Sequence, residues 1–169
     1  MKKIVTLLSL IIFSLPAISQ AIYEDERYVP ETDPLVNQKL KEWQNIKFGL
    51  LMHWGTYSQW GIVESWSICP EEYGWCERKK GANPNDYVAY KKEYEDLKKT
   101  FNPTKFDPER WAKAAKDAGM KYVVFTTKHH DGFSMFDSKY TDYKVTDPEC
   151  PFSSNLKSNI AKEIFDAFR

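Results

Sequence analysis

Two neighbouring histidines, His129 and His130, follow a run of apolar and β-branched residues that begins at Tyr122. Such a run is typical of a strand that is covered on both faces of a parallel sheet. Ligands of parallel α/β sheets bind just beyond the carboxyl ends of the strands. A neutral imidazole can donate and accept hydrogen bonds there and can stack its ring. The position therefore predicts that this pair contacts a ligand.

The third and last histidine of the chain, His53, follows another apolar run, residues 48–52, in the same way. We therefore expect the three imidazoles at one edge of one sheet. A carboxylate and two indoles lie next to His53 or in the segment after it. Hydrogen-bonding groups beside aromatic rings suit a sugar, which offers several hydroxyls and one apolar face. The predicted substrate-binding residues are His53, Trp54, Glu64, Trp66, His129 and His130.

Each of these residues also has a structural interpretation. His53 could be a hydrogen-bonded structural histidine, Trp54 and Trp66 could belong to the core, and Glu64 could be an exposed loop charge. Asp131, which precedes a glycine, is most simply a turn or cap residue.

Three other kinds of chemistry have weaker support in the sequence. Three histidines with Asp131 could supply zinc ligands, which makes a metal-dependent hydrolase an alternative. Adjacent histidines, however, have neither the helical HExxH spacing nor the His-x-His spacing of a strand. The sequence contains no GxSxG motif and no glycine-rich phosphate loop. We therefore expect no metal and no cofactor.

The surrounding pattern predicts the elements that position these residues. The clearest helix start is Asp107-Pro108-Glu109, with an N-cap aspartate and proline at the first helical position, and Gly119 marks the end. Strands are expected at 48–52 and 120–127, helices at 37–45, 85–99, 108–118 and 159–168, and long loops at 56–82 and 131–156. Strand, helix and strand in this order predict an α/β fold with parallel strands and long loops on their carboxyl side.

Two helices have a recognisable apolar face. In the helix at 85–99 the pattern predicts a buried stripe of Tyr87, Tyr90, Tyr94 and Leu97. In the last helix it predicts that Ile160, Ile164, Phe165 and Phe168 point inward.

The N-terminus has the features of a secretory signal. Lys2 and Lys3 precede an apolar stretch, residues 4–16, and small residues offer cleavage near 19–21. Residues 1–20 are thus predicted to be a signal peptide, and residues 22–169 the mature part of a secreted or periplasmic protein. The apolar stretch is short for a membrane span, so no stable membrane anchor is expected.

Charge and cysteine content narrow the possible partners. The chain of 169 residues has 24 basic and 24 acidic residues, which gives no charge excess for nucleic acid. Cys69 and Cys76 could form a disulfide in an oxidising compartment, and the third cysteine, Cys150, is left over. The oligomeric state is not indicated.

Several motifs resemble those of one enzyme family. Phe48-Gly49-Leu50-Leu51-Met52-His53-Trp54-Gly55-Thr56-Tyr57-Ser58 resembles the opening strand of the α-L-fucosidases of glycoside hydrolase family 29. Residues 106–111 and 115–122 are similar to the next signature of that family, and Thr126-Thr127-Lys128-His129-His130-Asp131-Gly132-Phe133 is the most specific match. The resemblance covers residues 40–169.

The resemblance implies a (β/α)8, TIM-like barrel that hydrolyses α-L-fucosidic bonds of fucosylated glycans with retention. By motif, His53, His129 and His130 would bind fucose hydroxyls. Glu64 and Trp66 look like the sugar-binding Glu-Trp pair of the family, although Ser65 separates them here.

The resemblance also predicts what this chain lacks. The family's nucleophile and acid/base lie on later strands, and no segment after His130 matches them. A retaining mechanism needs two carboxyl groups about 5 Å apart, and an eight-stranded barrel needs roughly 250 residues. We therefore expect the N-terminal portion of the barrel, which binds fucose without catalytic residues of its own and is inactive alone. A non-catalytic carbohydrate-binding fragment is the alternative.

Overall fold

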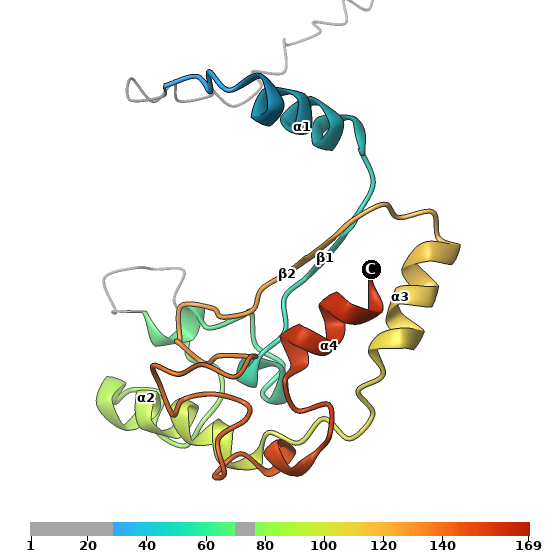
Figure 1. The fold of residues 1–169 in the computed structure, drawn as a ribbon. Helices are drawn as coiled ribbons and strands as arrows, with labels where there is room; N and C mark the ends of the chain where they lie inside the picture. Colours follow the sequence, from blue (N-terminus) through green and yellow to red (C-terminus); the bar gives the residue numbers. More distant parts are fainter. Residues whose placement is uncertain (1–28, 70–76) are drawn as a thin grey trace, which may run out of the picture. The chain divides into compact units, whose positions relative to one another are not determined.

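The computed structural model describes residues 29–69 and 77–169 (Figure 1). The chain divides into two compact units, Met1–Lys39 and Leu40–Arg169. The predicted signal peptide and Cys76 lie outside the described residues, so the cleavage site and the Cys69–Cys76 disulfide stay predictions. In the described part of the chain, no helix is long and apolar enough to cross a membrane.

Helix α1 (Pro34–Asn45) begins in the first unit and ends in the second. The carboxylate of Asp33 accepts a hydrogen bond from the backbone N–H of Leu35 at 2.8 Å, which satisfies one of the free donors at the helix start. The helix has no buried residue.

Two short parallel strands form the sheet of the second unit. Strand β1 (Leu50–Met52) pairs with β2 (Val123–Phe125), and Met52 lies opposite Phe125. The connection between them contains helices α2 (Tyr87–Asp96) and α3 (Pro108–Asp117), and helix α4 (Ile160–Ala167) follows β2. A parallel pair with a helical crossover confirms the α/β class.

Both strands are shorter than predicted, although their pairing extends further. The backbone N–H of Lys121 donates to the carbonyl of Phe48 at 2.9 Å, before the strands, and that of Thr126 donates to Met52 at 3.0 Å, after them. The chain segments therefore stay side by side up to the residues that precede the histidines.

The prediction that the strand beginning at Tyr122, here β2, is covered on both faces was wrong. Leu51 is 61% exposed and Val124 44% exposed, whereas Phe125 is buried. Side chains alternate along a strand, and Phe125 lies in one core cluster with Ile160 and Ile164 of α4. Helices α3 and α4 also pack against each other (Figure 1).

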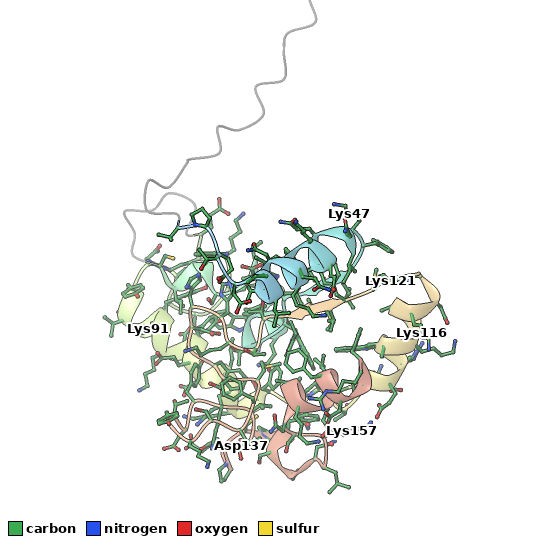
Figure 2. The ribbon with its side chains drawn as sticks, turned by 45° about the horizontal axis from the view of Figure 1, so that its top comes forward. Lys47, Lys91, Lys116, Lys121, Asp137 and Lys157 are labelled. Atoms are coloured by element: carbon green, nitrogen blue, oxygen red, sulfur yellow. The ribbon has the colours of Figure 1, made fainter. Side chains whose placement is uncertain are left out.

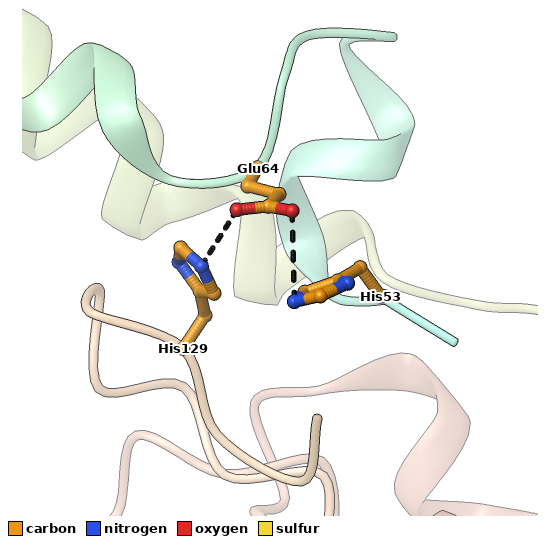
Figure 3. A group of neighbouring side chains, drawn as sticks. All are labelled: His53, Glu64 and His129. Carbon is orange, nitrogen blue, oxygen red and sulfur yellow. Dashed lines mark ion pairs between the residues drawn. The ribbon is translucent and has the colours of Figure 1, made fainter. Parts of the chain in front are cut away.

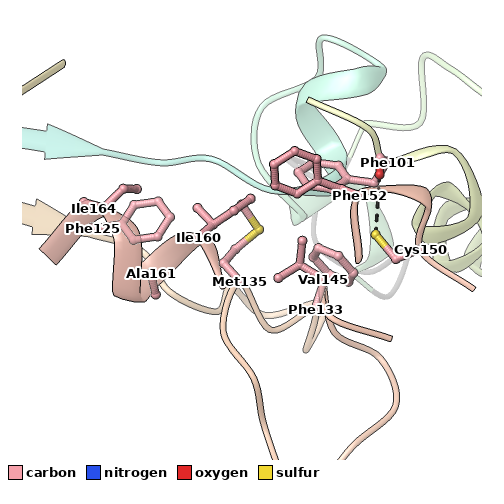
Figure 4. Packing of buried hydrophobic residues seen from close by; sticks show 10 residues of the cluster. All are labelled: Phe101, Phe125, Phe133, Met135, Val145, Cys150, Phe152, Ile160, Ala161 and Ile164. Carbon is pink, nitrogen blue, oxygen red and sulfur yellow. Dashed lines mark hydrogen bonds between the residues drawn. The ribbon is translucent and has the colours of Figure 1, made fainter. Parts of the chain in front are cut away.

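The main apolar core lies between this face of the sheet, α4 and the segment after β2 (Figure 4). Its Cys150 thiol donates to the carbonyl of Phe101 at 3.4 Å. Ile160 and Ile164 are buried as predicted, but Phe165 is 39% exposed, because it lies about 100° around the helix from Ile164. The buried members of the cluster are Phe101, Phe125, Phe133, Met135, Val145, Cys150, Phe152, Ile160, Ala161 and Ile164.

The helix signals in the sequence are confirmed where they are strongest. The Asp107 carboxylate accepts from the backbone N–H of Arg110 at 3.0 Å, and Gly119 ends α3 with a φ of +81°. In α2, Tyr90 and Tyr94 are fully buried. A 3-10 turn, Leu97–Thr100, continues that helix, and Leu97 is also buried. Tyr87, which was predicted to belong to the same buried stripe, is only partly buried, and its hydroxyl donates to the carbonyl of Ile68 at 2.9 Å.

Among the lysines that the structure describes, Lys98 has distinctive surroundings. Exposed charges such as Lys91, Lys116 and Asp137 are spread over separate elements (Figure 2). Lys98, by contrast, is buried, and its ammonium contacts carboxylate oxygens of Asp147 at 3.0 Å and Glu149 at 2.8 Å. This ion network joins the end of α2 to the loop after β2.

Candidate functional site

Glu64 lies between two of the three histidines (Figure 3). One carboxylate oxygen, Oε2, is 2.9 Å from Nε2 of His129, and the other, Oε1, is 3.6 Å from Nε2 of His53. His53 follows β1 directly, His129 comes four residues after β2, and their ring centroids are 5.9 Å apart. The predicted meeting of the histidines at one edge of the sheet is confirmed.

The backbone of Glu64 is held in an unusual conformation. Its φ is +50°, in the left-handed region that a residue with a Cβ adopts at a cost of about 1–2 kcal/mol. No other described non-glycine residue has a positive φ. Strained backbone of this kind clusters at ligand sites, where surrounding contacts hold it in place.

Trp66 contacts the same carboxylate. Its indole Nε1 donates to Oε2 of Glu64 at 2.7 Å. The ring lies edge-on to His129, with centroids 5.4 Å apart, and tilted against the exposed His130 at 4.6 Å. The structure thus brings five of the six predicted residues together: His53, Glu64, Trp66, His129 and His130.

Trp54, the sixth predicted residue, packs differently. Its ring contacts the apolar rings of Phe101, Phe106 and Trp111, with centroid distances of 5.9, 5.5 and 5.3 Å. It meets His53 on the wall of an open cavity of about 520 Å³. These ring contacts agree with the interpretation of Trp54 as a core residue. A role of Trp54 in sugar binding stays a prediction.

His129 is the most enclosed imidazole, with 9% of its side chain exposed. Burial lowers its pKa by disfavouring the charged form, and this effect outweighs the opposing attraction of the Glu64 carboxylate. The ring is therefore neutral at pH 7. Its second nitrogen, Nδ1, lies 2.5 Å from the hydroxyl oxygen of Ser65.

Asp131 was predicted to be a turn or cap residue; it is a turn residue, and it also anchors the loop that carries the histidine pair. Its Oδ1 accepts from the backbone N–H of Phe133 at 3.1 Å. Its Oδ2 accepts from the phenol of Tyr94 at 2.7 Å and from the hydroxyl of Thr56 at 3.3 Å. The carboxylate thus ties the loop after β2 to α2 and to the turn after β1.

These contacts change which residues could bind zinc in the alternative of a metal-dependent hydrolase. It needed three histidines and Asp131, but the Asp131 carboxylate is engaged by Tyr94 and Thr56. Within the described residues, the set close enough to hold a metal ion is His53, Glu64 and His129, whose nearest nitrogen and oxygen atoms lie within 4.8 Å of one another. In that set, His129 and Glu64 are within hydrogen-bonding distance at 2.9 Å, whereas His53 and Glu64 are 3.6 Å apart.

The residues that support the site were not predicted from the sequence. Ser65 is 1% exposed and touches His129, but the sequence showed it only as an interruption between Glu64 and Trp66. Tyr94 was predicted to be buried in an apolar stripe, and nothing in that pattern indicated that its hydroxyl reaches Asp131. Tyr57, 3% exposed, lies edge-on to His129 with centroids 5.8 Å apart and was not predicted at all.

Known proteins similar to this chain are α-L-fucosidases. The model of the α-L-fucosidase family matches residues 16–169. Tissue α-L-fucosidase of Rattus norvegicus is 37% identical over 119 residues, which make up 66% of this chain and 24% of that protein. This chain spans about a quarter of the length of the first curated relatives it matches.

Solved structures agree with the sequence comparison. α-L-Fucosidase isoenzyme 1 from Paenibacillus thiaminolyticus has a TM-score of 0.58 and 37% identity, with 79% of this chain and 26% of that one covered. A family 29 α-L-fucosidase from Bacteroides thetaiotaomicron, trapped as a covalent intermediate with 2-fluoro-fucosyl fluoride, has a TM-score of 0.56 and 31% identity over 83% of this chain and 28% of that one. The chain belongs to the α-L-fucosidase family, glycoside hydrolase family 29.

Proposed function

We propose that this chain forms the L-fucose-binding part of an α-L-fucosidase active site, at the carboxyl edge of two neighbouring strands of a (β/α)8 barrel. The observation that carries the proposal is the Glu64 carboxylate held between His53 and His129 at the ends of β1 and β2. Ligands of such barrels bind at this edge. The substrate would be a fucosylated glycan, and the protein would be secreted or periplasmic, with no cofactor.

The hydrogen bonds of Glu64 indicate where a sugar hydroxyl binds. Oε2 already faces two donors, the indole of Trp66 and Nε2 of His129. Oε1 is 3.6 Å from His53, too far for a hydrogen bond. A hydroxyl between these two groups could donate to Oε1 and contact His53 at the same time. The ring of Trp66, which contacts the same carboxylate, and the ring of His130 tilted against it would cover an apolar part of the sugar.

Binding of this kind also gives specificity. Polar groups built to contact a hydroxyl are left unpaired by a ligand that lacks it, and such a site rejects the deficient ligand strongly. The half-buried Glu64 carboxylate would therefore favour a sugar whose hydroxyl reaches Oε1.

For the whole protein we propose retaining hydrolysis, which is supported by the covalent intermediate trapped in the Bacteroides thetaiotaomicron relative. The two reacting carboxyl groups should stand about 5 Å apart across the scissile bond. In the described part of this chain, Glu64 is engaged in the binding contacts and Asp131 in anchoring the loop. We propose that the 169-residue chain binds fucose but does not turn over a fucoside.

Calorimetric titration with a fucose-like iminosugar tests the binding role. The wild-type chain should bind, and Glu64→Gln and His129→Ala should each weaken affinity by about 10- to 100-fold, the loss expected when a hydrogen bond to a charged or buried group disappears. Glu95→Gln is the matched control, because it removes the same charge from an exposed position on α2. Affinity of Glu64→Gln equal to that of Glu95→Gln would refute the binding role.

An aryl α-L-fucoside assay tests the proposal that the 169-residue chain does not turn over a fucoside. No release of the aryl group is expected from the purified chain, and turnover that disappears with Glu64→Gln would contradict the proposal.

The metal-dependent hydrolase, which the spacing of His53, Glu64 and His129 keeps as a second candidate, predicts stoichiometric zinc in the purified protein. Metal analysis separates the two.

A further inference from the structure

We infer that Ser65 is a positioning residue of the sugar site, whose hydroxyl holds His129 in the tautomer that carries its proton on Nε2. This inference rests on the proposed function, because the His129 ring contacts Glu64, the residue proposed to bind the sugar. It assigns a role to the residue that separates Glu64 from Trp66 in this sequence.

Ser65 is enclosed and has two polar neighbours. The residue is 1% exposed, and its Oγ lies 2.5 Å from Nδ1 of His129. The backbone N–H of Asp131 donates to the same Oγ at 3.2 Å. Ser65 thus connects the loop after β1 to two residues of the loop after β2.

The proton positions follow from counting donors and acceptors. The Asp131 N–H can only donate, so Oγ accepts from it. A hydroxyl oxygen has two lone pairs, so the bond from Asp131 by itself leaves the direction of the contact with Nδ1 open. The hydroxyl proton of this buried serine also needs an acceptor, and Nδ1 of His129 lies within hydrogen-bonding distance, so an unprotonated Nδ1 satisfies it. The remaining ring nitrogen, Nε2, carries the proton and donates it to Oε2 of Glu64 across 2.9 Å.

The opposite tautomer fails at both ends of the ring. A bare Nε2 would face the ionised Glu64 oxygen at 2.9 Å, so that two acceptors would meet without a proton. The hydroxyl proton of Ser65 would lose its acceptor inside a buried turn, and an unsatisfied buried polar group is costly. A doubly protonated ring is disfavoured because the side chain is 9% exposed.

A directed series of hydrogen bonds results. It runs from the Asp131 N–H through Ser65 and His129 to Oε2 of Glu64, where the Trp66 indole arrives from the other side. Both donors therefore use the same carboxylate oxygen, and Oε1 stays available to a ligand. Ser65 acts on the ligand through His129 and Glu64 and need not touch it.

Nitrogen-15 NMR of the histidine rings tests the inference without any sugar. In the wild-type chain at pH 7.5, long-range proton–nitrogen correlations should show His129 with a protonated Nε2 and an unprotonated Nδ1, and its Nε2 proton should exchange slowly with water. A protonated Nδ1, or a rapid mixture of tautomers, would overturn the inference. This measurement needs no variant.

Two variants test the role of the hydroxyl. In Ser65→Ala the ring loses its anchor at Nδ1, so the Nε2 proton should exchange faster and iminosugar affinity should fall by about 3- to 10-fold, as for the loss of one hydrogen bond. Ser67→Ala is the matched control, because Ser67 is a buried serine of the same turn, two residues further on. Equal exchange rates and affinities in the two variants would overturn the role.

A third variant separates loss of the hydrogen bond from misfolding of the Ser65→Ala chain. Ser65→Cys keeps a weak donor of similar size, and it should lie between wild type and Ser65→Ala in exchange rate. If the iminosugar does not bind the wild-type chain while the NMR results are as expected, the proposed function fails and the positioning of His129 by Ser65 stands.

Discussion

The hydrogen bond between Tyr94 and Asp131 should be the main tie between α2 and the loop that carries the histidine pair. The phenol donates to the carboxylate at 2.7 Å, and Tyr94 is completely buried. Burial, together with the adjacent carboxylate, raises the pKa of the phenol well above its usual value, so the hydroxyl stays a donor at all physiological pH values. We expect Asp131→Ala to destabilise the fold strongly.

The magnitude follows from the groups that would lose a partner. A hydrogen bond to a charged group contributes about 1.5–3 kcal/mol, and a neutral donor left unsatisfied in the interior costs about 1–3 kcal/mol. Asp131→Ala deprives the buried Tyr94 phenol and the buried Thr56 hydroxyl of their acceptor. Together these losses amount to about 3–5 kcal/mol of the free energy of unfolding.

A double-mutant cycle measured by urea denaturation isolates the pair. Wild type, Tyr94→Phe, Asp131→Ala and the double variant should give a coupling energy of about 1.5–3 kcal/mol. Asp117→Ala, which removes an exposed carboxylate paired with Lys113, is the control and should cost no more than about 1 kcal/mol. Additivity of the two single changes within about 0.5 kcal/mol would refute the reasoning.

Three further predictions concern groups near the site and in the core. Lys98→Met should lower the free energy of unfolding by about 3 kcal/mol in urea titrations, because the Asp147 side chain, 11% exposed, loses its counter-ion; an unchanged midpoint would contradict this. Burial lowers the pKa of His129 below its ordinary value of 6.5, so the unfolded chain takes up the proton first as pH falls. Stability present above pH 6.5 should therefore be lost on acidification to a greater extent in wild type than in His129→Gln, and parallel curves would exclude this effect. Burial also raises the pKa of the Cys150 thiol, so its reaction with a thiol reagent at pH 7.5 should wait for unfolding. Peptide mapping separates Cys150 from the less buried Cys69, and prompt labelling of Cys150 in the folded chain would show that the core is open there.

Local signals in the sequence predicted the local structure well. The N-cap aspartate, proline and terminal glycine around α3 each act within one helical turn, so the sequence contains the whole interaction. The position of His53 and His129 was also predictable, because the parallel arrangement of two strands decides where their carboxyl ends lie. The family resemblance added the roles of these residues in binding fucose.

Features that depend on packing between distant segments were not predictable. The exposure of Leu51 and Val124 depends on which face of the sheet a helix covers, and an apolar run looks the same in either case. The contacts of Ser65 with His129 and of Tyr94 with Asp131 join residues 64 and 37 positions apart. No spacing rule indicates them, because they arise only when two loops meet.

The assignment of this edge of the sheet to fucose is tested most directly by NMR of the chain with L-fucose. Intermolecular NOEs should connect sugar protons to ring protons of His53, His129 and Trp66, and they should vanish in Glu64→Gln while persisting in Glu95→Gln. Bound fucose whose NOEs come instead from residues remote from Glu64, or that persist unchanged in Glu64→Gln, would contradict the assignment.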